Sequence, residues 1–245
     1  MFNPKNKEIK LIADSNPNVI KQLENFFNKN TNVYIDFANV LGWQKKLNWR
    51  VDIVKLKEFL DSFSSIKSVK FYYGTLPGDK NSERIINDAK ASGYEIITKP
   101  VKIIKISIDI SSITPNSPII LDNFIKKSLL SKLDLETIEF INDKIKGLNE
   151  QGIFYLEHKK CNFDVEIGRD MEIDFIKNNN ENFALWSGDS DFADIASHIS
   201  SSNKKVMLFM TSGQVSSELA ISLGNSNMFD IKKIKEFIAF SKDLK

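Results

Sequence analysis

The sequence predicts an α/β fold in which a mostly parallel sheet is flanked by helices, with one segment inserted into it. Short apolar runs typical of buried strands alternate with amphipathic helical stretches, and strands joined through helices usually run parallel. Hydrophobic residues make up 42% of the 245 residues and charged residues 27%, which suits a globular protein with a sizeable core. The alternation weakens at about 105–150, which we interpret as the insertion.

The N-terminal part of the chain supplies three of the expected strands. Residues 1–30 consist of a polar lead-in and then a short helix whose apolar residues share one face. The alternating segments that follow are expected strands at 32–40, 69–76 and 94–104 and expected helices at 51–63 and 77–93. Gly93 favours a helix end at that position.

The segment at about 105–150 departs from this pattern. Its first part reads as an extra hairpin or an extended stretch, because Pro115 and Pro118 argue against a central strand. Residues 122–152 read as one or two helices. We therefore expect an addition to the core sheet that shapes a substrate channel, binds a protein partner or decorates the edge.

The regular alternation returns after the insertion. The expected elements are a helix at 163–179, a strand at 183–188, a helix at 191–203, a strand at 205–211, a helix from about Ser216 and a closing segment at 229–240. We expect the strands of both parts to form one sheet.

Composition limits the classes of function. The formal net charge is +2, so any nucleic-acid surface must be a local patch. A lone cysteine, Cys161, and two histidines exclude an intramolecular disulfide and a Cys- or His-based metal centre. The N-terminus lacks a signal-peptide core, and no apolar run has the length of a membrane span. We expect a cytoplasmic protein that does not use a membrane.

Two groups of acidic residues follow expected strands. Asp36, with Asn39 after it, ends the first strand, and Asp189 and Asp191 follow the strand at 183–188. Ligands of open parallel sheets bind beyond the carboxyl ends of the strands. Clustered carboxylates repel one another unless cations neutralise them, and oxygen ligands favour Mg²⁺ or Mn²⁺.

A third group of acids lies on the helix expected at 163–179. Asp170 and Asp174 are four residues apart and share a helix face, whereas Asp164 lies nearly two turns before Asp170. Glu166 is a further acid on the same helix. We predict that Asp36, Asp170 and Asp189 converge in one cleft.

Four stretches, in order over about 32–235, carry a family resemblance: YIDFANV, KKCNFDVEIGRDM, WSGDSDFADI and SSELAISLGNSNMFDI. The chain resembles the NYN domain family of PIN-like nucleases. Asp36 and Asn39 fit its opening strand, Lys160, Asp164 and Asp170 fit its acidic helix, and Ser-Gly-Asp-Ser-Asp-Phe is its most specific stretch. The insertion is longer than the family pattern leads us to expect.

The resemblance implies a three-layer, Rossmann-like PIN-like domain over 31–240, interrupted at 105–150. It also implies metal-dependent cleavage of RNA phosphodiester bonds, with RNA preferred to DNA. The expected ligands of one or two Mg²⁺ or Mn²⁺ ions are Asp36, Asp170, Asp189 and Asp191. Asp164 is expected as an outer ligand or proton acceptor. The sequence leaves a homo-oligomer open.

Polar and basic residues near these acids are candidates for binding the substrate. Asn39 and Ser187 could orient water or a scissile phosphate. The basic candidates for contacts with flanking phosphates are Lys45, Lys46, Lys159, Lys160 and Arg169. Trp43 and Trp49 bracket the first two lysines, so this stretch either stacks a base or is a loop with one buried tryptophan. We favour the loop.

Each acid also has a structural interpretation. Ser190 or Asp191 could cap the helix that begins near Phe192, and Asn39 could cap the segment after Asp36. Asp36 could be a turn residue, and Asp164 and Asp170 could be solvated helix residues. Capping leaves Asp189 unexplained, so we favour a metal site. Asp174 and Glu166 are expected to be surface acids.

Two other functions compete with the nuclease. An NYN domain could bind RNA or protein without turnover, although the intact set of aspartates argues against it. A nucleotide-sugar transferase could use Asp189 and Asp191 as a DxD metal site, but the sequence lacks a glycine-rich phosphate loop.

Overall fold

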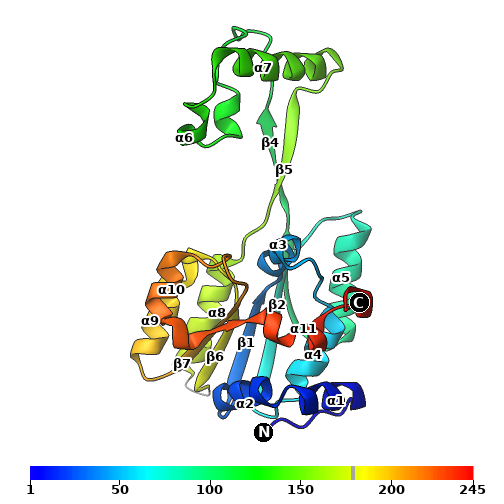
Figure 1. Cartoon of the computed structure of the whole chain (residues 1–245), viewed down its shortest axis with the longest axis vertical. Helices are drawn as coiled ribbons and strands as arrows, with labels where there is room; N and C mark the ends of the chain where they lie inside the picture. The colour runs from blue at the N-terminus through cyan, green and yellow to red at the C-terminus, as the bar shows by residue number, and fades with distance from the viewer. Residues whose placement is uncertain (178–179, 245) are drawn as a thin grey trace. The chain divides into compact units, whose positions relative to one another are not determined.

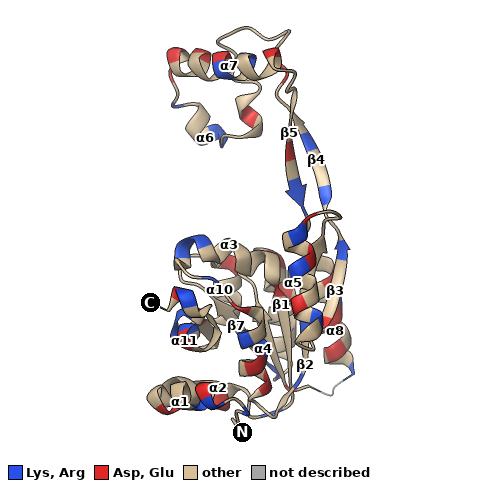
Figure 2. Ribbon diagram, turned by 90° about the vertical axis from the view of Figure 1, so that its right-hand side faces the viewer, with Lys and Arg blue, Asp and Glu red and all other residues tan. Residues whose placement is uncertain are grey.

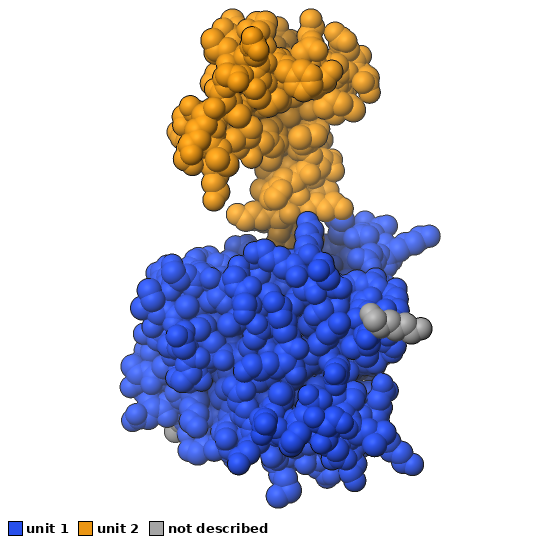
Figure 3. Space-filling view, in the orientation of Figure 1, with its two compact units in different colours: residues 1–100, 162–245 blue, residues 101–161 orange. Residues whose placement is uncertain are grey.

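The computed structural model describes residues 1–177 and 180–244. The chain forms two compact units, one of residues 1–100 and 162–245 and the other of residues 101–161 (Figure 3). The second unit encloses the range expected for the insertion. The assignment of 31–240 to one interrupted nuclease domain stays a prediction.

The first unit is built on a six-stranded sheet in which all neighbours are parallel (Figure 1). In spatial order the strands are β3 (Glu95–Pro100), β2 (Ile66–Thr75), β1 (Thr31–Asp36), β6 (Asn182–Trp186), β7 (Lys205–Met210) and β8 (Met228–Asp230). The expected parallel α/β sheet is thereby confirmed. The strand order runs outward in both directions from the β1–β6 pair, so the topology reverses there.

Helices cover both faces of the sheet, as expected. One face packs against α1 (Lys7–Ser15), α2 (Pro17–Phe26), α3 (Phe37–Leu47), α4 (Ile53–Asp61), α5 (Lys80–Ala91) and α11 (Lys235–Ile238). The helices α8 (Asp164–Ile176), α9 (Ala193–Ser201) and α10 (Ser217–Leu223) contact β1 or β7. Short 3₁₀ turns are η2 (Ser190–Phe192), η3 (Asn225–Asn227), η4 (Ile231–Ile234) and η5 (Ser241–Asp243).

The two central strands form a rigid frame. Every residue of β1 and β6 is buried, as parallel strands covered on both faces require. β1 ends at Asp36, four residues earlier than predicted. The Asp36 carboxylate accepts the backbone N–H of Asn39 at 3.2 Å and so caps α3, which makes residues 37–40 helical. The cap is therefore Asp36 and not Asn39, which the sequence offered as one alternative.

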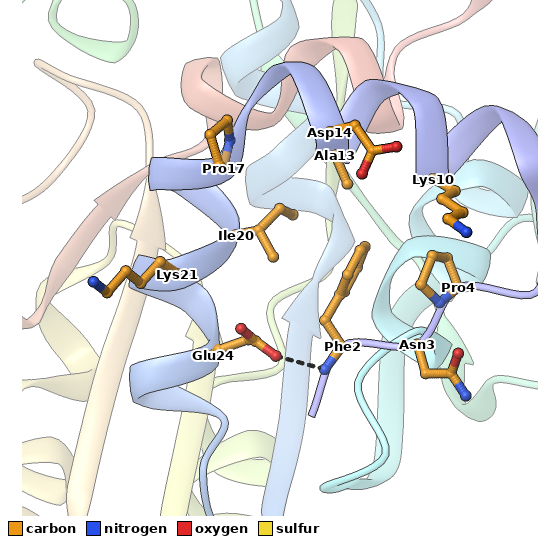
Figure 4. A pocket seen from close by; sticks show the side chains of 10 residues that line it. All are labelled: Phe2, Asn3, Pro4, Lys10, Ala13, Asp14, Pro17, Ile20, Lys21 and Glu24. Carbon is orange, nitrogen blue, oxygen red and sulfur yellow. Dashed lines mark hydrogen bonds between the residues drawn. The ribbon is translucent and has the colours of Figure 1, made fainter.

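The N-terminal residues are more ordered than a polar lead-in. Residues 7–15 form α1, because Asn6 accepts the backbone N–H of Glu8 as an N-cap. Phe2 packs against Phe63, and its backbone N–H donates to Glu24 at 2.8 Å (Figure 4). These helices border a pocket of about 710 Å³, and none of its lining residues is a predicted site residue. No described helix is long and apolar enough to cross a membrane.

The second unit joins an antiparallel hairpin to a small helical part. The hairpin pairs β4 (Lys102–Ser107) with β5 (Tyr155–Lys160), and the helical part contains η1 (Leu121–Asn123), α6 (Lys127–Leu130) and α7 (Leu135–Glu150). The expected strand at 94–104 is thus two strands: Pro100 ends β3, and residues 102–104 pair with β5. Leu121, Leu130 and Ile138 form its small core.

Candidate metal centre

The acidic site is formed where the carboxyl ends of β1 and β6 meet. Ile35 pairs with Trp186, so Asp36 and Ser187 are the next residues on neighbouring strands. Strand order reverses at this pair, and such a switch point opens a crevice for ligands. Asp36 is buried with 7% exposure.

Three aspartates come together at this edge. Oxygen atoms of Asp164, Asp189 and Asp191 lie within 4.8 Å of one another. Asp164 is the first residue of α8, and Asp189 and Asp191 belong to the turn after β6. Asp164 and Asp189 are half-buried, whereas Asp191 is exposed. Three of the five predicted catalytic residues therefore cluster.

Asp36 lies close enough to this cluster for the charges of Asp164 and Asp189 to affect its pKa. Burial raises the pKa of Asp36 to about 6, and the charges of Asp164 and Asp189 contribute to the increase, against the backbone N–H groups of Asn39 and Ala38. The negative charges of these aspartates therefore repel one another at this position.

The same repulsion acts on Asp164. Burial raises the pKa of Asp164, and the charges of Asp189 and Asp191 add to the increase. A hydrogen bond from Asn162 at 2.6 Å and the charge of Lys99 oppose it. The sequence analysis did not single out Asn162 or Lys99: Asn162 lies within the KKCNFDVEIGRDM stretch but was given no role there, and Lys99 lies outside the four stretches.

The turn after β6 is held by close backbone packing. A Cβ atom at Gly188 would lie 1.9 Å from the carbonyl oxygen of Gln214, and the carbonyl of Gly188 accepts the N–H of Ser216 at 2.9 Å. Ser187 is buried, and its hydroxyl accepts the N–H of Asp189 at 3.3 Å. Glycine is therefore required at 188 for the turn to pack here.

Asp189 itself caps the short turn that follows. Its carboxylate accepts the N–H of Asp191 at 3.4 Å, so the cap is Asp189 and not the alternatives Ser190 and Asp191, and the expectation that capping leaves Asp189 unexplained is wrong. Capping and membership of the acidic cluster thus coincide in one residue, and the two roles must be separated by experiment.

Asp170 has different partners from the other acids. It accepts the hydroxyl of Tyr72 at 2.9 Å and pairs with Arg169 at 3.0 Å. Six residues of helix place it about 9 Å along the axis from Asp164. Among the described residues, Asp170 is not a member of the group of three aspartates. Its expected role as a metal ligand stays a prediction.

Asp174 and Glu166 are not the free surface acids that we expected. Asp174 accepts hydrogen bonds from Lys70 and Tyr34 at 2.7 Å and from Asn32 at 2.8 Å. Burial alone would raise the pKa of Asp174, but these hydrogen bonds lower it. Glu166 pairs with Lys99 at 2.6 Å. Polar residues on a buried strand such as β1 require partners, and this signal in the sequence was overlooked.

The predicted substrate-binding residues are spread over several elements. Lys45 and Lys46 are exposed in the last turn of α3, and Lys46 donates to the carbonyl of Gly213 at 3.2 Å. Asn39 is half-buried in the first turn of α3. Arg169 is exposed on α8, beside Asp170. Lys160 is exposed in β5 of the second unit.

Neither tryptophan of the GWQKKLNWR stretch offers a face to a base. Trp43 and Trp49 are exposed by only 1% and 5%, and Trp43 lies within α3. The expectation of a loop with one buried tryptophan is therefore wrong in both respects.

The part of the chain that carries the aspartate cluster also resembles known proteins. Residues 129–223 match the family model of the NYN domain. This match confirms the family resemblance for that range, which contains Asp164, Asp189 and Asp191, whereas Asp36 lies before it. The NYN domain is a nuclease-like family, but this match alone specifies no activity.

A solved structure extends the comparison to most of the chain. A protein of unknown function from Vibrio parahaemolyticus is 17% identical, with a TM-score of 0.52 over 86% of this chain and 96% of that one. At this identity the likeness concerns the fold alone. A search of curated proteins found no match.

Proposed function

We propose that this NYN-like chain is a metal-dependent nuclease that hydrolyses phosphodiester bonds of RNA. The observation that carries the proposal is the convergence of Asp164, Asp189 and Asp191 within 4.8 Å at the sheet's switch point. All three lie in the range that matches the NYN domain.

The donor set suits a hard divalent cation. Ligands about 2.1 Å from Mg²⁺ lie at most ~4.2 Å apart, so small inward movements of the three carboxylates would suffice. All three donors are carboxylate oxygens, which favour Mg²⁺ or Mn²⁺. When bound, such a cation would activate water and neutralise charge on the leaving oxygen.

The protein residues divide the remaining work. Asp164, Asp189 and Asp191 would hold the cation, and their proximity supports a more direct role for Asp164 than the outer ligand or proton acceptor expected from the family pattern. Asp36 is buried at the strand end beside the cluster and is the candidate for accepting a proton from the attacking water. Asp170 and Asp174 position α8 through their bonds to β2 and β1.

The test is cleavage of labelled single-stranded RNA and DNA of the same sequence with Mg²⁺, with Mn²⁺ and with EDTA. We expect metal-dependent cleavage, faster on RNA, and a loss of at least ~100-fold in Asp164→Asn. Asp194→Asn, the same change at an exposed residue of α9, is the matched control. Cleavage that persists in EDTA, or that survives Asp164→Asn, would contradict the proposal.

A further inference from the structure

The β4–β5 hairpin is a ribbon with both faces in solvent. All six residues of β5 and five of the six in β4 are exposed, Ile106 being half-buried. Ile104 and Tyr155 are large apolar side chains with 43% and 56% exposure. An isolated two-stranded ribbon is only marginally stable in water, so a ribbon of this kind gains from a partner.

Positive charge is concentrated on the ribbon. Its twelve residues carry four lysines and one acid, whereas residues 108–154 of the same unit carry five lysines and seven acids. Figure 2 shows the lysines along β4 and β5. The ribbon is therefore basic although the whole chain is nearly neutral, with a net charge of +2.

The cross-strand register sets one like-charge pair and one opposite-charge pair across the ribbon, the latter being Lys105 and Glu157. Lys102 pairs with Lys160, and residues directly opposite on a ribbon share a face with Cβ atoms ~5 Å apart. Such a like-charge pair destabilises a ribbon unless an anion lies between the ammonium groups. Lys159 adds a further positive charge on the other face.

We propose that this ribbon binds the phosphate backbone of a single-stranded nucleic acid, without reading its sequence. The inference rests on the proposed nuclease function. Lys102 and Lys160 would hold phosphates, and the exposed Tyr155 ring gives a face on which a base can stack. Lys160 precedes Asp164 by four residues in the sequence, so the ribbon itself is covalently linked to the segment that carries Asp164.

The test measures binding separately from cleavage. Fluorescence anisotropy follows a labelled oligouridine about 20 nucleotides long, in EDTA and in an Asp189→Asn background. The variant is Lys102→Gln with Lys160→Gln; the control, Lys126→Gln with Lys127→Gln, removes the same charge from exposed residues at the start of α6. We expect binding about tenfold weaker in the ribbon variant and a salt slope reduced by roughly 1.4.

A second variant separates binding from folding. Lys102→Glu sets opposite charges across the ribbon, so it should keep or raise the thermal midpoint while weakening RNA binding. Equal loss in the ribbon and control variants would overturn the inference, and so would equal competition by an oligoglutamate, which would indicate an acidic protein partner. Ribbon-dependent binding without any metal-dependent cleavage would support the ribbon and count against the nuclease function alone.

Discussion

At the scale of single residues, the acidic centre depends on four aspartates in unequal surroundings. Asp36 is buried at a strand end, Asp164 begins a helix, and Asp189 and Asp191 flank a tight turn. Strand-end positions could be predicted from the sequence, because an apolar run that stops at an acid marks the sheet's edge. The choice between Asp164 and Asp170 could not, because helix spacing does not reveal which face meets the sheet.

The raised pKa of Asp36 gives a pH dependence with a definite sign. Its pKa is about 6 in the fold, against about 4 unfolded, so the metal-free fold binds more protons between these values and loses stability as pH rises. Asp36→Asn removes this loss. Between pH ~4 and pH ~7, the free energy of unfolding of the variant should therefore rise by up to roughly 3 kcal/mol relative to that of the wild type. Urea unfolding in EDTA at several pH values measures the difference, and a pH-independent difference would refute the prediction.

Asp189→Asn separates the capping role from the metal role. Asparagine caps as well as aspartate, so the free energy of unfolding without metal should change by less than ~0.5 kcal/mol. Loss of one charged ligand should lower Mn²⁺-dependent RNA cleavage by orders of magnitude, roughly 100-fold or more. The thermal midpoint and the cleavage rate are measured on the same preparations. Unchanged cleavage would reduce Asp189 to a cap.

At the scale of elements, α8 is the part that joins the acidic cluster to the sheet. Tyr72 of β2 and Tyr34 of β1 donate to Asp170 and Asp174, one turn apart on the helix. This docking fixes the start of α8, where Asp164 stands. The helix could be predicted from its sequence, but its docking could not, because these bonds join residues about 100 or more positions apart.

Asp170→Asn tests whether Asp170 positions the helix or binds metal. The amide oxygen can still accept the Tyr72 hydroxyl, so a positioning role predicts cleavage within roughly fivefold of wild type. Tyr72→Phe should cost about 1 kcal/mol of unfolding free energy, because it removes the donor. A loss in Asp170→Asn as large as that in Asp164→Asn would make Asp170 a ligand after all.

Gly188→Ala tests the packing of the turn after β6. The new Cβ atom would stand 1.9 Å from the Gln214 carbonyl oxygen, so backbone must move, at a cost of about 1–3 kcal/mol. Cleavage should fall because Asp189 is the next residue. Gly42→Ala, in α3 with no neighbour within 4 Å, should instead leave stability equal or raise it by up to about 1 kcal/mol. Equal stability of the two variants, by urea unfolding, would contradict the prediction.

At the scale of the whole molecule, alternation of apolar runs predicted the parallel sheet, and its register and order came only from the structure. The order β3-β2-β1-β6-β7-β8 decides which strand ends meet. The sequence also concealed the start of the second unit, because apolar residues occur on both sides of Pro100, in Ile96–Ile97 and in Ile103–Ile104, and were read as one strand. Residues 155–160 escaped prediction because a solvent-exposed ribbon lacks the apolar alternation of a half-buried strand.

The pairing of Lys102 with Lys160 also bears on how such a chain can change. The chain enters the hairpin at Lys102 and leaves it at Lys160. These two residues are directly opposed, so their Cα atoms lie about 5 Å apart. A gap of that width can be closed by a two-residue turn. The segment 101–161 therefore begins and ends at neighbouring positions, so a short turn could take its place in the chain.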